Sequence, residues 1–423
     1  MTRVVVTGMG VISSNAHGLD DFEGALREGR SGVRFYQKLK DLNFACQVGG
    51  IPQNTDALKT KYFSEHQVMA MNSNMIYAGI AGIDCWQDAG FSPRQEADSE
   101  VYWDTGAIVG TGMGGPDSFG EVVIPQTNEG KARRMGSTMV EQTMSSAPSA
   151  WLGGCLGLGG QVTSNSSACT TGTEAIIEAY FKLQRGQAKR FLAGGSEGSS
   201  HYTWATFDAM RVLARGYNDR PECASRPMSA SASGFVPSSG AGILMVETLE
   251  SARERGARIY AEILGGHINC GGQRNGGSMT APNPEGIIRC IREALSCARI
   301  HPRDVDFISG HLTATKADTL EIMNWQKALE RNPDEFPLVN ATKSLIGHAL
   351  GAAGGIECVA AVLQLNRGFV HGSLNCEDIH PVLEPFAKSI PHETRAVEMK
   401  ILAKASFGFG DVNGCVIFKK WDE

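Results

Sequence analysis

Cys169 is the residue of this sequence best placed to act as a nucleophile. It ends the segment Asn165-Ser-Ser-Ala-Cys169, between a short predicted strand at 162–164 and a predicted helix at 173–184. A thiol at such a turn meets free backbone N–H groups and the positive end of the helix dipole, which favour the thiolate. The layout resembles a nucleophile elbow, although the G-x-S-x-G spelling is absent. The alternative is an inert buried thiol, the usual state of a free cysteine.

Two histidines stand in segments that suit a partner for this thiol. His311 directly follows a predicted strand at 305–310, and the carboxyl edges of strands are where α/β sites form. His348 lies in Gly347-His-Ala-Leu-Gly-Ala-Ala-Gly354, where small residues allow backbone and ligand to approach closely. Either histidine could instead be a packed or capped structural residue. Lys343 and Glu357 are lone charges in the same apolar stretch, so we expect them to pair in a salt bridge that orients the site.

Composition excludes several classes of protein. The chain has 423 residues, of which 42% are hydrophobic and 20% charged, so a folded body with a large core is expected. The net charge of −6 gives no basic excess for nucleic acid. The 11 cysteines include no C-x-x-C pair, which argues against zinc and for a reducing cytoplasm. No signal peptide and no run of ~18 apolar residues occur, so we expect no membrane span.

Short strands alternate with helices along the chain, which predicts an α/β fold. Long helices are predicted over 68–89 and 137–152. The 51 glycines gather beside the apolar runs, which indicates tight turns and close backbone approach. The segments 175–186 and 357–368 end in Leu-Gln-Arg-Gly and Leu-Asn-Arg-Gly, so we interpret the chain as a duplication with its break near 250–257.

Four spaced motifs together resemble those of the β-ketoacyl-acyl-carrier-protein synthases. They are Asn165-Ser-Ser-Ala-Cys169, His311-x-Thr-x-Thr, Lys343-Ser-x-x-Gly-His348 and Ser406-Phe-Gly-Phe-Gly410, with further matches at residues 3–10, 224–227, 234–236 and 240–242. The resemblance spans the whole chain in family order and is to the elongating, thiolase-superfamily type, as a divergent branch.

The resemblance implies a thiolase-like fold, in which two pseudo-symmetric βαβαβαββ halves form five αβαβα layers. Residues 1–255 would form the half with the nucleophile and the dimer interface, and 256–423 the half with both catalytic histidines. The roles implied for individual residues are catalysis for Cys169, His311 and His348, site support for Lys343 and Glu357, oxyanion-hole backbone N–H groups for Cys169 and Phe407, pantetheine binding for Thr313 and Thr315, and the acyl pocket for Met113 and Phe207.

The implied reaction is a decarboxylative Claisen condensation of an acyl group on Cys169 with malonyl-acyl carrier protein. It gives a β-ketoacyl thioester in fatty acid, polyene or polyketide elongation, with no metal and no cofactor. The implied partners are acyl carrier protein and a second copy of the chain or a related subunit, in the cytoplasm.

The sequence departs from the family pattern at several points. Leu312 replaces a glycine and adds bulk where pantetheine is expected to pass, and the loop to Asp318 is one residue shorter. Residues 229–233 lack the usual acidic charge, and Gly410-Asp-Val-Asn413 replaces Gly-Gly-Thr-Asn. These changes suggest a specialised acyl substrate.

Alternative readings are less well supported. A non-catalytic or partner-dependent subunit resembling a chain-length factor would lack Cys169. A thiolase would need a second catalytic cysteine, but Cys415 lies within a predicted strand as a core thiol. A starter-type synthase would carry one histidine and one asparagine. The glycines at 110–115 have the wrong spacing for a dinucleotide site. The basic cluster Lys131-Ala-Arg-Arg134 is a hypothesis for carrier docking, against a merely solvated surface.

Overall fold

The strands form two five-stranded halves with the same internal arrangement. In this computed structural model, which describes residues 2–95 and 98–422, the strand order is β10-β9-β13-β14-β8-β1-β7-β6-β4-β5. The strands of the first half are β1 (Val4–Ile12), β4 (Thr105–Gly110), β5 (Val162–Thr163), β6 (Arg190–Glu197) and β7 (Gly240–Thr248). Those of the second are β8 (Ala261–Cys270), β9 (Phe307–Ser309), β10 (Leu338–Asn340), β13 (Ile401–Gly408) and β14 (Val412–Lys420).

The pairing directions repeat between the halves. In the first half β4 is parallel to β5 and β6, while β7 is antiparallel to β6 and β1. In the second half β9 is parallel to β10 and β13, while β14 is antiparallel to β13 and β8. The halves meet where β1 pairs with β8 at Val4, Val5 and Val6. This repeated order confirms the predicted α/β fold and shows the expected duplication.

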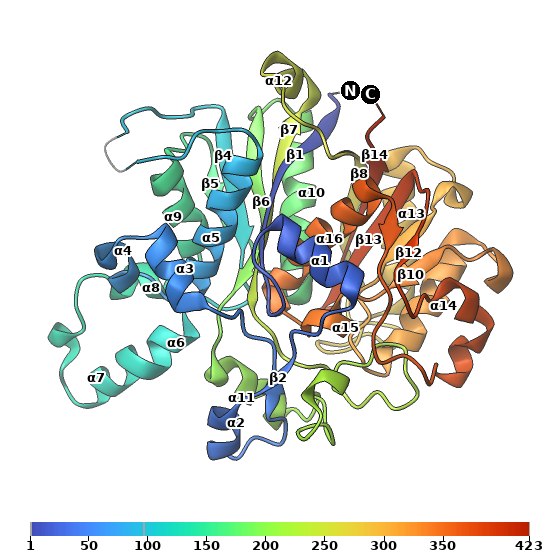
Figure 1. Cartoon of the computed structure of the whole chain (residues 1–423), viewed down its shortest axis with the longest axis horizontal. Helices are drawn as coiled ribbons and strands as arrows, with labels where there is room; N and C mark the ends of the chain where they lie inside the picture. Colours follow the sequence, from blue (N-terminus) through green and yellow to red (C-terminus); the bar gives the residue numbers. More distant parts are fainter. Residues whose placement is uncertain (1, 96–97, 423) are drawn as a thin grey trace.

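Helices cover both outer faces and fill the space between the halves (Figure 1). The central helices are α10 (Thr171–Gln184) and α16 (Ala353–Arg367), which contact strands of both halves. Helices α5 (Ser73–Asp88) and α9 (Ala147–Leu156) cover the first half, and α13 (Pro284–Ala298) and α14 (Ala317–Leu329) cover the second. The result is the five-layered αβαβα arrangement of a thiolase-like fold, with a separate apolar cluster on each side of the sheets.

Glycine contacts bring the central layer together. A Cβ atom on Gly172 of α10 would lie 2.4 Å from the backbone nitrogen of Gly355 in α16. A Cβ on Gly195 would lie 2.3 Å from the carbonyl oxygen of Gly351. Only glycine permits such an approach, so the predicted close contact of backbones is confirmed between the two helices that flank the site.

Two predicted helices are each broken in the structure. The segment 68–89 contains the end of α4 (Glu65–Met69) and then α5, because the Asn72 side chain accepts a hydrogen bond from the Met75 N–H and starts a new helix. The segment 137–152 divides into α8 (Met139–Thr143) and α9, with Met144 extended between them. Hydrophobic periodicity continued across both breaks and therefore did not reveal them.

Smaller elements complete the chain. They are α1 (Leu19–Glu28), β2 (Arg34–Phe35), α2 (Gln37–Asp41), β3 (Val48–Gly49), α3 (Thr55–Tyr62), α6 (Pro116–Ser118), α7 (Ile124–Asn128), α11 (His201–Ala209), α12 (Leu249–Glu254), α15 (Lys343–Ile346), β11 (Phe369–Val370) and β12 (Arg395–Ala396), with short turns of 3-10 or π-helix between them. Within residues 2–95 and 98–422, no helix has the length and apolar character that a membrane crossing requires.

Candidate active site

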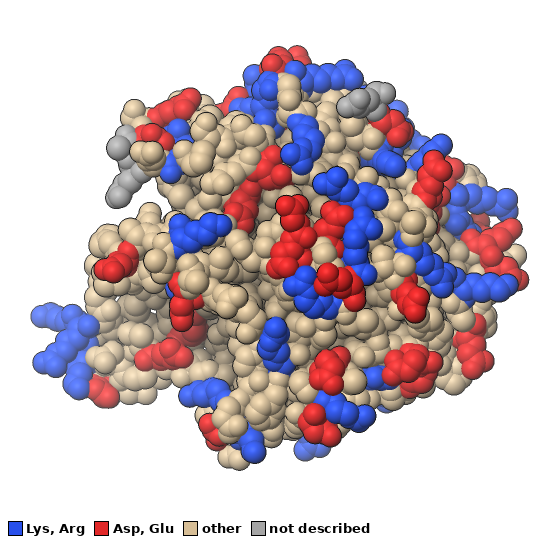
Figure 2. All heavy atoms as spheres, in the orientation of Figure 1, with Lys and Arg blue, Asp and Glu red and all other residues tan. Residues whose placement is uncertain are grey.

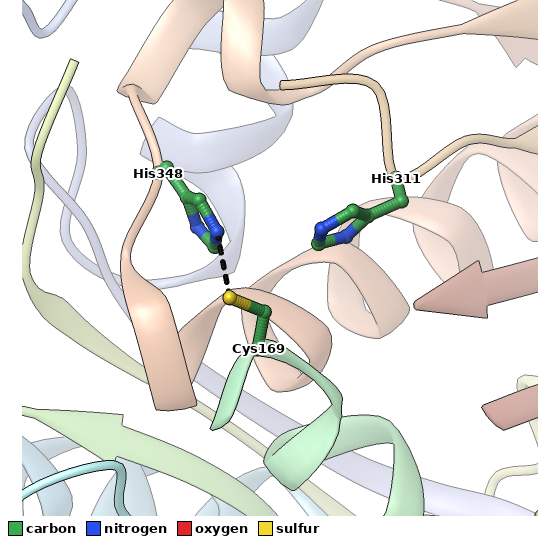
Figure 3. A group of neighbouring side chains, drawn as sticks. All are labelled: Cys169, His311 and His348. Carbon is green, nitrogen blue, oxygen red and sulfur yellow. Dashed lines mark hydrogen bonds between the residues drawn. The ribbon is translucent and has the colours of Figure 1, made fainter. Parts of the chain in front are cut away.

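Cys169, His311 and His348 meet in one buried cluster, although they come from distant parts of the chain (Figure 3). The Cys169 Sγ lies 3.1 Å from the Nε2 atom of His348. The ring centroids of the two histidines are 5.4 Å apart, and both imidazoles point toward the sulfur. Cys169 lies on a single 3-10 turn, residues Ala168–Thr170, immediately before α10. The strand-to-helix turn predicted from the sequence therefore holds the thiol.

Hydrogen bonds fix the proton of each imidazole on the nitrogen that faces the site. The backbone N–H of Leu350 donates to His348 Nδ1 at 3.2 Å, so Nδ1 carries the lone pair and Nε2 the proton. The Lys343 ammonium lies 3.3 Å from His311 Nδ1 and selects the same tautomer there. Burial and the Lys343 charge lower the pKa of both histidines well below the usual value. The site thus presents two neutral Nε2–H donors.

Burial dominates the acidity of the Cys169 thiol. It raises the pKa of the Cys169 thiol to about 11, although the Lys343 charge and the Phe409 N–H act in the opposite direction. The expected preference of this turn for the thiolate is therefore outweighed by burial. A local sequence does not show how completely a turn is buried.

Lys343 and Glu357 form the expected ion pair beneath the histidines. The Lys343 Nζ contacts Glu357 Oε1 and donates to the His311 carbonyl oxygen at 2.6 Å. Both side chains are almost fully buried, so neither charge has water to stabilise it. Lys343 belongs to α15 and Glu357 to α16, and the pair orients His311 through the bond from Lys343 to its carbonyl oxygen.

Two carboxylates hold the turn that carries His311. Glu321 accepts the N–H groups of His311 at 2.6 Å and Leu312 at 2.7 Å. Asp318 accepts those of Thr313 at 2.8 Å and Ala314 at 3.1 Å. These four bonds stabilise a turn in which Leu312 has φ +26°.

The Leu312 side chain is completely buried in the apolar cluster beside α14. The added bulk of this residue therefore lies in the core of the second half. The hydroxyls of Thr313 and Thr315 lie 3.0 Å apart and are half-buried, so the shortened loop still presents them as a pair.

The backbone donor beside the sulfur belongs to Phe409, not to Phe407. Phe407 lies within β13, opposite Asn413 of β14, and its ring is 6.2 Å from the His311 ring. Phe409 follows the end of β13, and its N–H hydrogen-bonds to Cys169. The N–H group at the sulfur thus lies two positions after the Phe407 that the family resemblance implied. The motif Ser406-Phe-Gly-Phe-Gly410 contains two Phe-Gly pairs, and sequence alone does not tell which one ends the strand.

The remaining departures from the family pattern form contacts of their own. The Asp411 carboxylate accepts the N–H groups of Gln273 and Asn283, each at 2.8 Å, and so holds the loop 271–283 beside Phe409. The segment 229–233 has no acidic residue of its own, but the carboxylate of Asp378 lies beside it and accepts a hydrogen bond from the Ser231 N–H at 3.0 Å.

The two residues expected in the acyl pocket both lie at α11, since the Thr203 hydroxyl of that helix contacts the Met113 sulfur at 3.5 Å. Phe207 of α11 lies 5.4 Å from the Phe235 ring and 6.3 Å from the Phe409 ring. Met113 is 40% exposed, on the loop after β4, and its N–H donates to Glu197 at 3.2 Å. Glu197 also accepts the Gly351 N–H at 2.9 Å, which ties this loop to the segment after His348.

Spacing alone would let the cluster hold a metal, because its three ligand atoms lie within 4.8 Å of one another. The tautomers oppose metal binding, because each Nε2 carries a proton and so has no lone pair to offer. Coordination would require that proton to move to Nδ1, which faces the Lys343 ammonium or the Leu350 N–H. Cys415 is fully buried in the middle of β14, as the core-thiol interpretation predicted.

A thiol nucleophile with two N–H donors at the meeting point of duplicated α/β halves defines a condensing enzyme of the thiolase-like class, an acyltransferase. Comparison with known proteins gives the family. Residues 1–252 match the β-ketoacyl synthase N-terminal domain, and residues 260–377 match its C-terminal domain. The chain belongs to the β-ketoacyl synthase family. Enzymes of this family use acyl groups carried on acyl carrier protein and need no free cofactor.

Individual relatives cover the whole chain. The chain is 35% identical to 3-oxoacyl-[acyl-carrier-protein] synthase 1 of Escherichia coli strain K12, over 99% of each protein. A β-ketoacyl synthase from Burkholderia phymatum has a TM-score of 0.90 and 27% identity over the full length of both chains. A type II polyketide ketosynthase, solved in complex with its acyl-carrier protein, has a TM-score of 0.88 and 26% identity over 99% of this chain and 100% of its own.

Proposed function

We propose that Cys169 accepts an acyl group from acyl carrier protein and that His311 and His348 then direct its condensation with malonyl-acyl carrier protein. The observation that carries this proposal is the pair of Nε2–H donors facing the half-buried Cys169 sulfur. In the first step the Cys169 sulfur forms a thioester with the acyl carbon, and the carrier sulfur leaves with the thiol proton. Backbone N–H groups of Cys169 and Phe409 stabilise the tetrahedral oxyanion.

In the second step the malonyl carboxylate leaves as carbon dioxide and its bonding electrons pass to the α-carbon. The negative charge spreads to the thioester oxygen, where the two Nε2–H groups stabilise it. The carbanion attacks the acyl-Cys169 carbonyl and expels the Cys169 sulfur, which takes up one proton from solvent. The product is a β-ketoacyl thioester two carbons longer, still bound to its carrier.

The paired hydroxyls support binding of a pantetheine arm. Thr313 and Thr315 lie beside His311 and offer hydroxyl donors and acceptors for the amides of such an arm. The acyl chain itself would lie between the loop of Met113 and the aromatic rings of Phe207 and Phe409.

A basic turn supplies a docking surface for the acidic carrier. Lys131, Arg133 and Arg134 are exposed, and Figure 2 shows their charges gathered at the left edge of the molecule, beyond α7. Charge reversal of Arg133 and Arg134 should raise KM for the carrier substrate. An unchanged KM would refute the docking role.

We also propose which half holds which part of the site, and that the protein forms a dimer. Residues 1–255 would hold the nucleophile and the dimer interface, and 256–423 both histidines, which agrees with the helix α12 ending at Glu254 and β8 beginning at Ala261. A homodimer is proposed, with a heterodimer as the alternative. All eleven cysteines are free, which suits the reducing cytoplasm that we propose as the compartment.

Intact-mass measurement after incubation with acyl-carrier thioesters of several lengths tests the proposal. Wild type should gain one acyl mass, the Cys169→Ala variant none, and malonyl-carrier should discharge the adduct to a β-ketoacyl product. The matched control is Cys155→Ala, another half-buried thiol, which should load as wild type does. If no chain loads wild type, the protein is a partner-dependent subunit like a chain-length factor, and the proposed activity is wrong for the isolated chain.

A further inference from the structure

A second lysine, Lys404, lies completely buried beside the active site. It belongs to β13, where Ala403 and Ala405 on either side are also inaccessible to solvent. A buried ammonium group is costly unless each of its protons has an acceptor. The Lys404 Nζ donates hydrogen bonds to Ser406 Oγ at 3.0 Å and to the carbonyl oxygen of Ala405, and it forms an ion pair with Glu357 Oε2 at 2.9 Å. Its charge is therefore held in one fixed position.

The Lys404 ammonium extends the ion pair already described. Glu357 contacts Lys404 through Oε2 and Lys343 through Oε1, so one carboxylate lies between two cations. Lys343 in turn donates to the His311 carbonyl oxygen at 2.6 Å. The row Lys404–Glu357–Lys343–His311 thus joins β13, α16, α15 and the turn after β9.

A branch of the same row reaches the nucleophile. The Ser406 hydroxyl, which accepts from Lys404, also bonds the Thr173 hydroxyl at 2.9 Å. Thr173 lies in the first turn of α10, directly after the turn that carries Cys169. Lys404 therefore contacts side chains that locate both the histidine and the thiol.

We propose that Lys404 is a positioning residue of the condensation site, whose buried ammonium holds Glu357 and, through it, Lys343 and His311. The inference rests on the proposed function. Lys404 contacts no reacting atom, and it acts through the residues that do.

The charges around the imidazoles give this role a signature beyond packing. The cations Lys343 and Lys404 face the anion Glu357, and Glu321, Glu197 and Asp318 accept backbone N–H groups nearby. Burial and the Lys343 charge are the largest causes that lower the pKa of both histidines; His348 and then Lys404 lower that of His311 further, and Lys404 that of His348. If either imidazole were protonated, its Nδ1 proton would point at another donor, the Lys343 ammonium for His311 or the Leu350 N–H for His348, and the two would repel. Lys404 thus favours the neutral tautomers that the proposed mechanism uses.

The test compares the full-length Lys404→Met variant with wild type, using Lys388→Met, an exposed lysine, as the matched control. In the variant the imidazole pKa values should rise, because one cation is removed. A unit charge within ~10 Å at an effective dielectric constant of ~20 shifts a pKa by about one unit. In the pH profile of malonyl-carrier decarboxylation, the pH at which the rate falls on the acid side should therefore rise by about one unit. We expect kcat to fall by ~10–100-fold, as for a small misplacement of reacting groups, with KM little changed.

A small amine provides the second measurement. Lys404→Ala leaves two hydrogen-bond acceptors and one carboxylate oxygen around an empty space, so ammonium or methylammonium should restore part of kcat while tetramethylammonium, which has no N–H, should not. If Lys404→Met fails to fold, Lys404→Ala purified in ammonium chloride gives the same comparison when the salt is exchanged for sodium chloride. A folded variant with an unchanged acid limb and no response to amines would overturn the proposal.

Failure of the proposed function is distinguishable from failure of this inference. The imidazole titrations can be followed by NMR of the labelled histidines without any turnover. If wild type does not condense but the histidine pKa values still rise in Lys404→Met, the positioning role stands and the assigned reaction is wrong. If wild type condenses and the histidine pKa values in Lys404→Met are unchanged, the assigned reaction stands and the positioning role of Lys404 is wrong.

Discussion

Gly355 is the position where packing of the central layer can be tested most directly. It lies in α16, two residues before Glu357, and a Cβ there would be 2.2 Å from the Gly242 carbonyl oxygen and 2.8 Å from the Gly195 nitrogen. Both neighbours are backbone atoms of central strands, so neither can rotate away. Gly355→Ala therefore requires α16 to move by about 1 Å from the sheet, to reach normal van der Waals separation.

The expected free-energy change combines two opposing effects. Alanine gains about 1 kcal/mol of helix propensity over glycine. Overpacking costs about 1–3 kcal/mol and occasionally more; because the contacts of this Cβ are backbone atoms, we take a cost of about 3–4 kcal/mol and expect a net loss of about 2–3 kcal/mol. The matched control is Gly24→Ala in α1, where the nearest atom to the added Cβ is the Arg30 guanidinium at 3.6 Å. That variant should gain about 0.5–1 kcal/mol.

Guanidinium unfolding of the two variants and wild type measures the difference, and acyl loading of Cys169 measures its effect on the site. Because α16 carries Glu357, a 1 Å displacement should also slow turnover by about 10²-fold. If Gly355→Ala proved as stable and as active as Gly24→Ala, the claim that glycine contacts set the spacing of the central layer would be wrong.

Three further predictions concern the site. His311→Ala and His348→Ala should each slow malonyl-carrier decarboxylation by about 10²–10³-fold, measured by release of carbon dioxide, since each removes one N–H donor; an unaffected rate in either variant would exclude that donor. Because burial raises the pKa of the Cys169 thiol to about 11, its thiolate fraction should increase about tenfold per pH unit below that value, so alkylation of Cys169 by iodoacetamide should keep accelerating through pH 9–10; a plateau near pH 7 would contradict the burial argument. Asp411→Ala removes the acceptors of two backbone N–H groups, so hydrogen exchange in the loop 271–283 should accelerate, whereas Asp411→Asn, which keeps one carbonyl oxygen, should have a smaller effect; equal exchange in all three proteins would show that the carboxylate does not hold the loop.

The sequence allowed prediction of the residues whose motifs are local. Cys169, His311 and His348 each stand at a strand end or turn that the surrounding residue types indicate, and their convergence followed from the family resemblance. Lys343 and Glu357 could be paired because isolated charges in an apolar segment need partners. The alternation of elements predicted the α/β class and the two similar helix endings a duplication, whereas the five-layered thiolase-like arrangement followed from the family resemblance.

What the sequence did not reveal depends on contacts between distant segments. Glu197 accepts a hydrogen bond from Gly351, 154 positions away, so its role has no local pattern. Lys404 was recognisable only as a lone charge in an apolar closing strand, the same signal that identified Lys343. Glu321 follows Asp318 at helical spacing, a pattern that predicts a shared face but not the two backbone donors that it accepts.

The repeated strand order explains why one active site arises from two similar halves. Cys169 lies between the edge strand β5 and the central helix α10 of the first half, and His348 lies between the corresponding β10 and α16 of the second. His311 follows β9 as the Met113 loop follows its counterpart β4. Equivalent positions of the duplicated unit thus carry a thiol in one half and an imidazole in the other. In the proposed mechanism, one half therefore holds the acyl group on Cys169 while the other stabilises the enolate that attacks it.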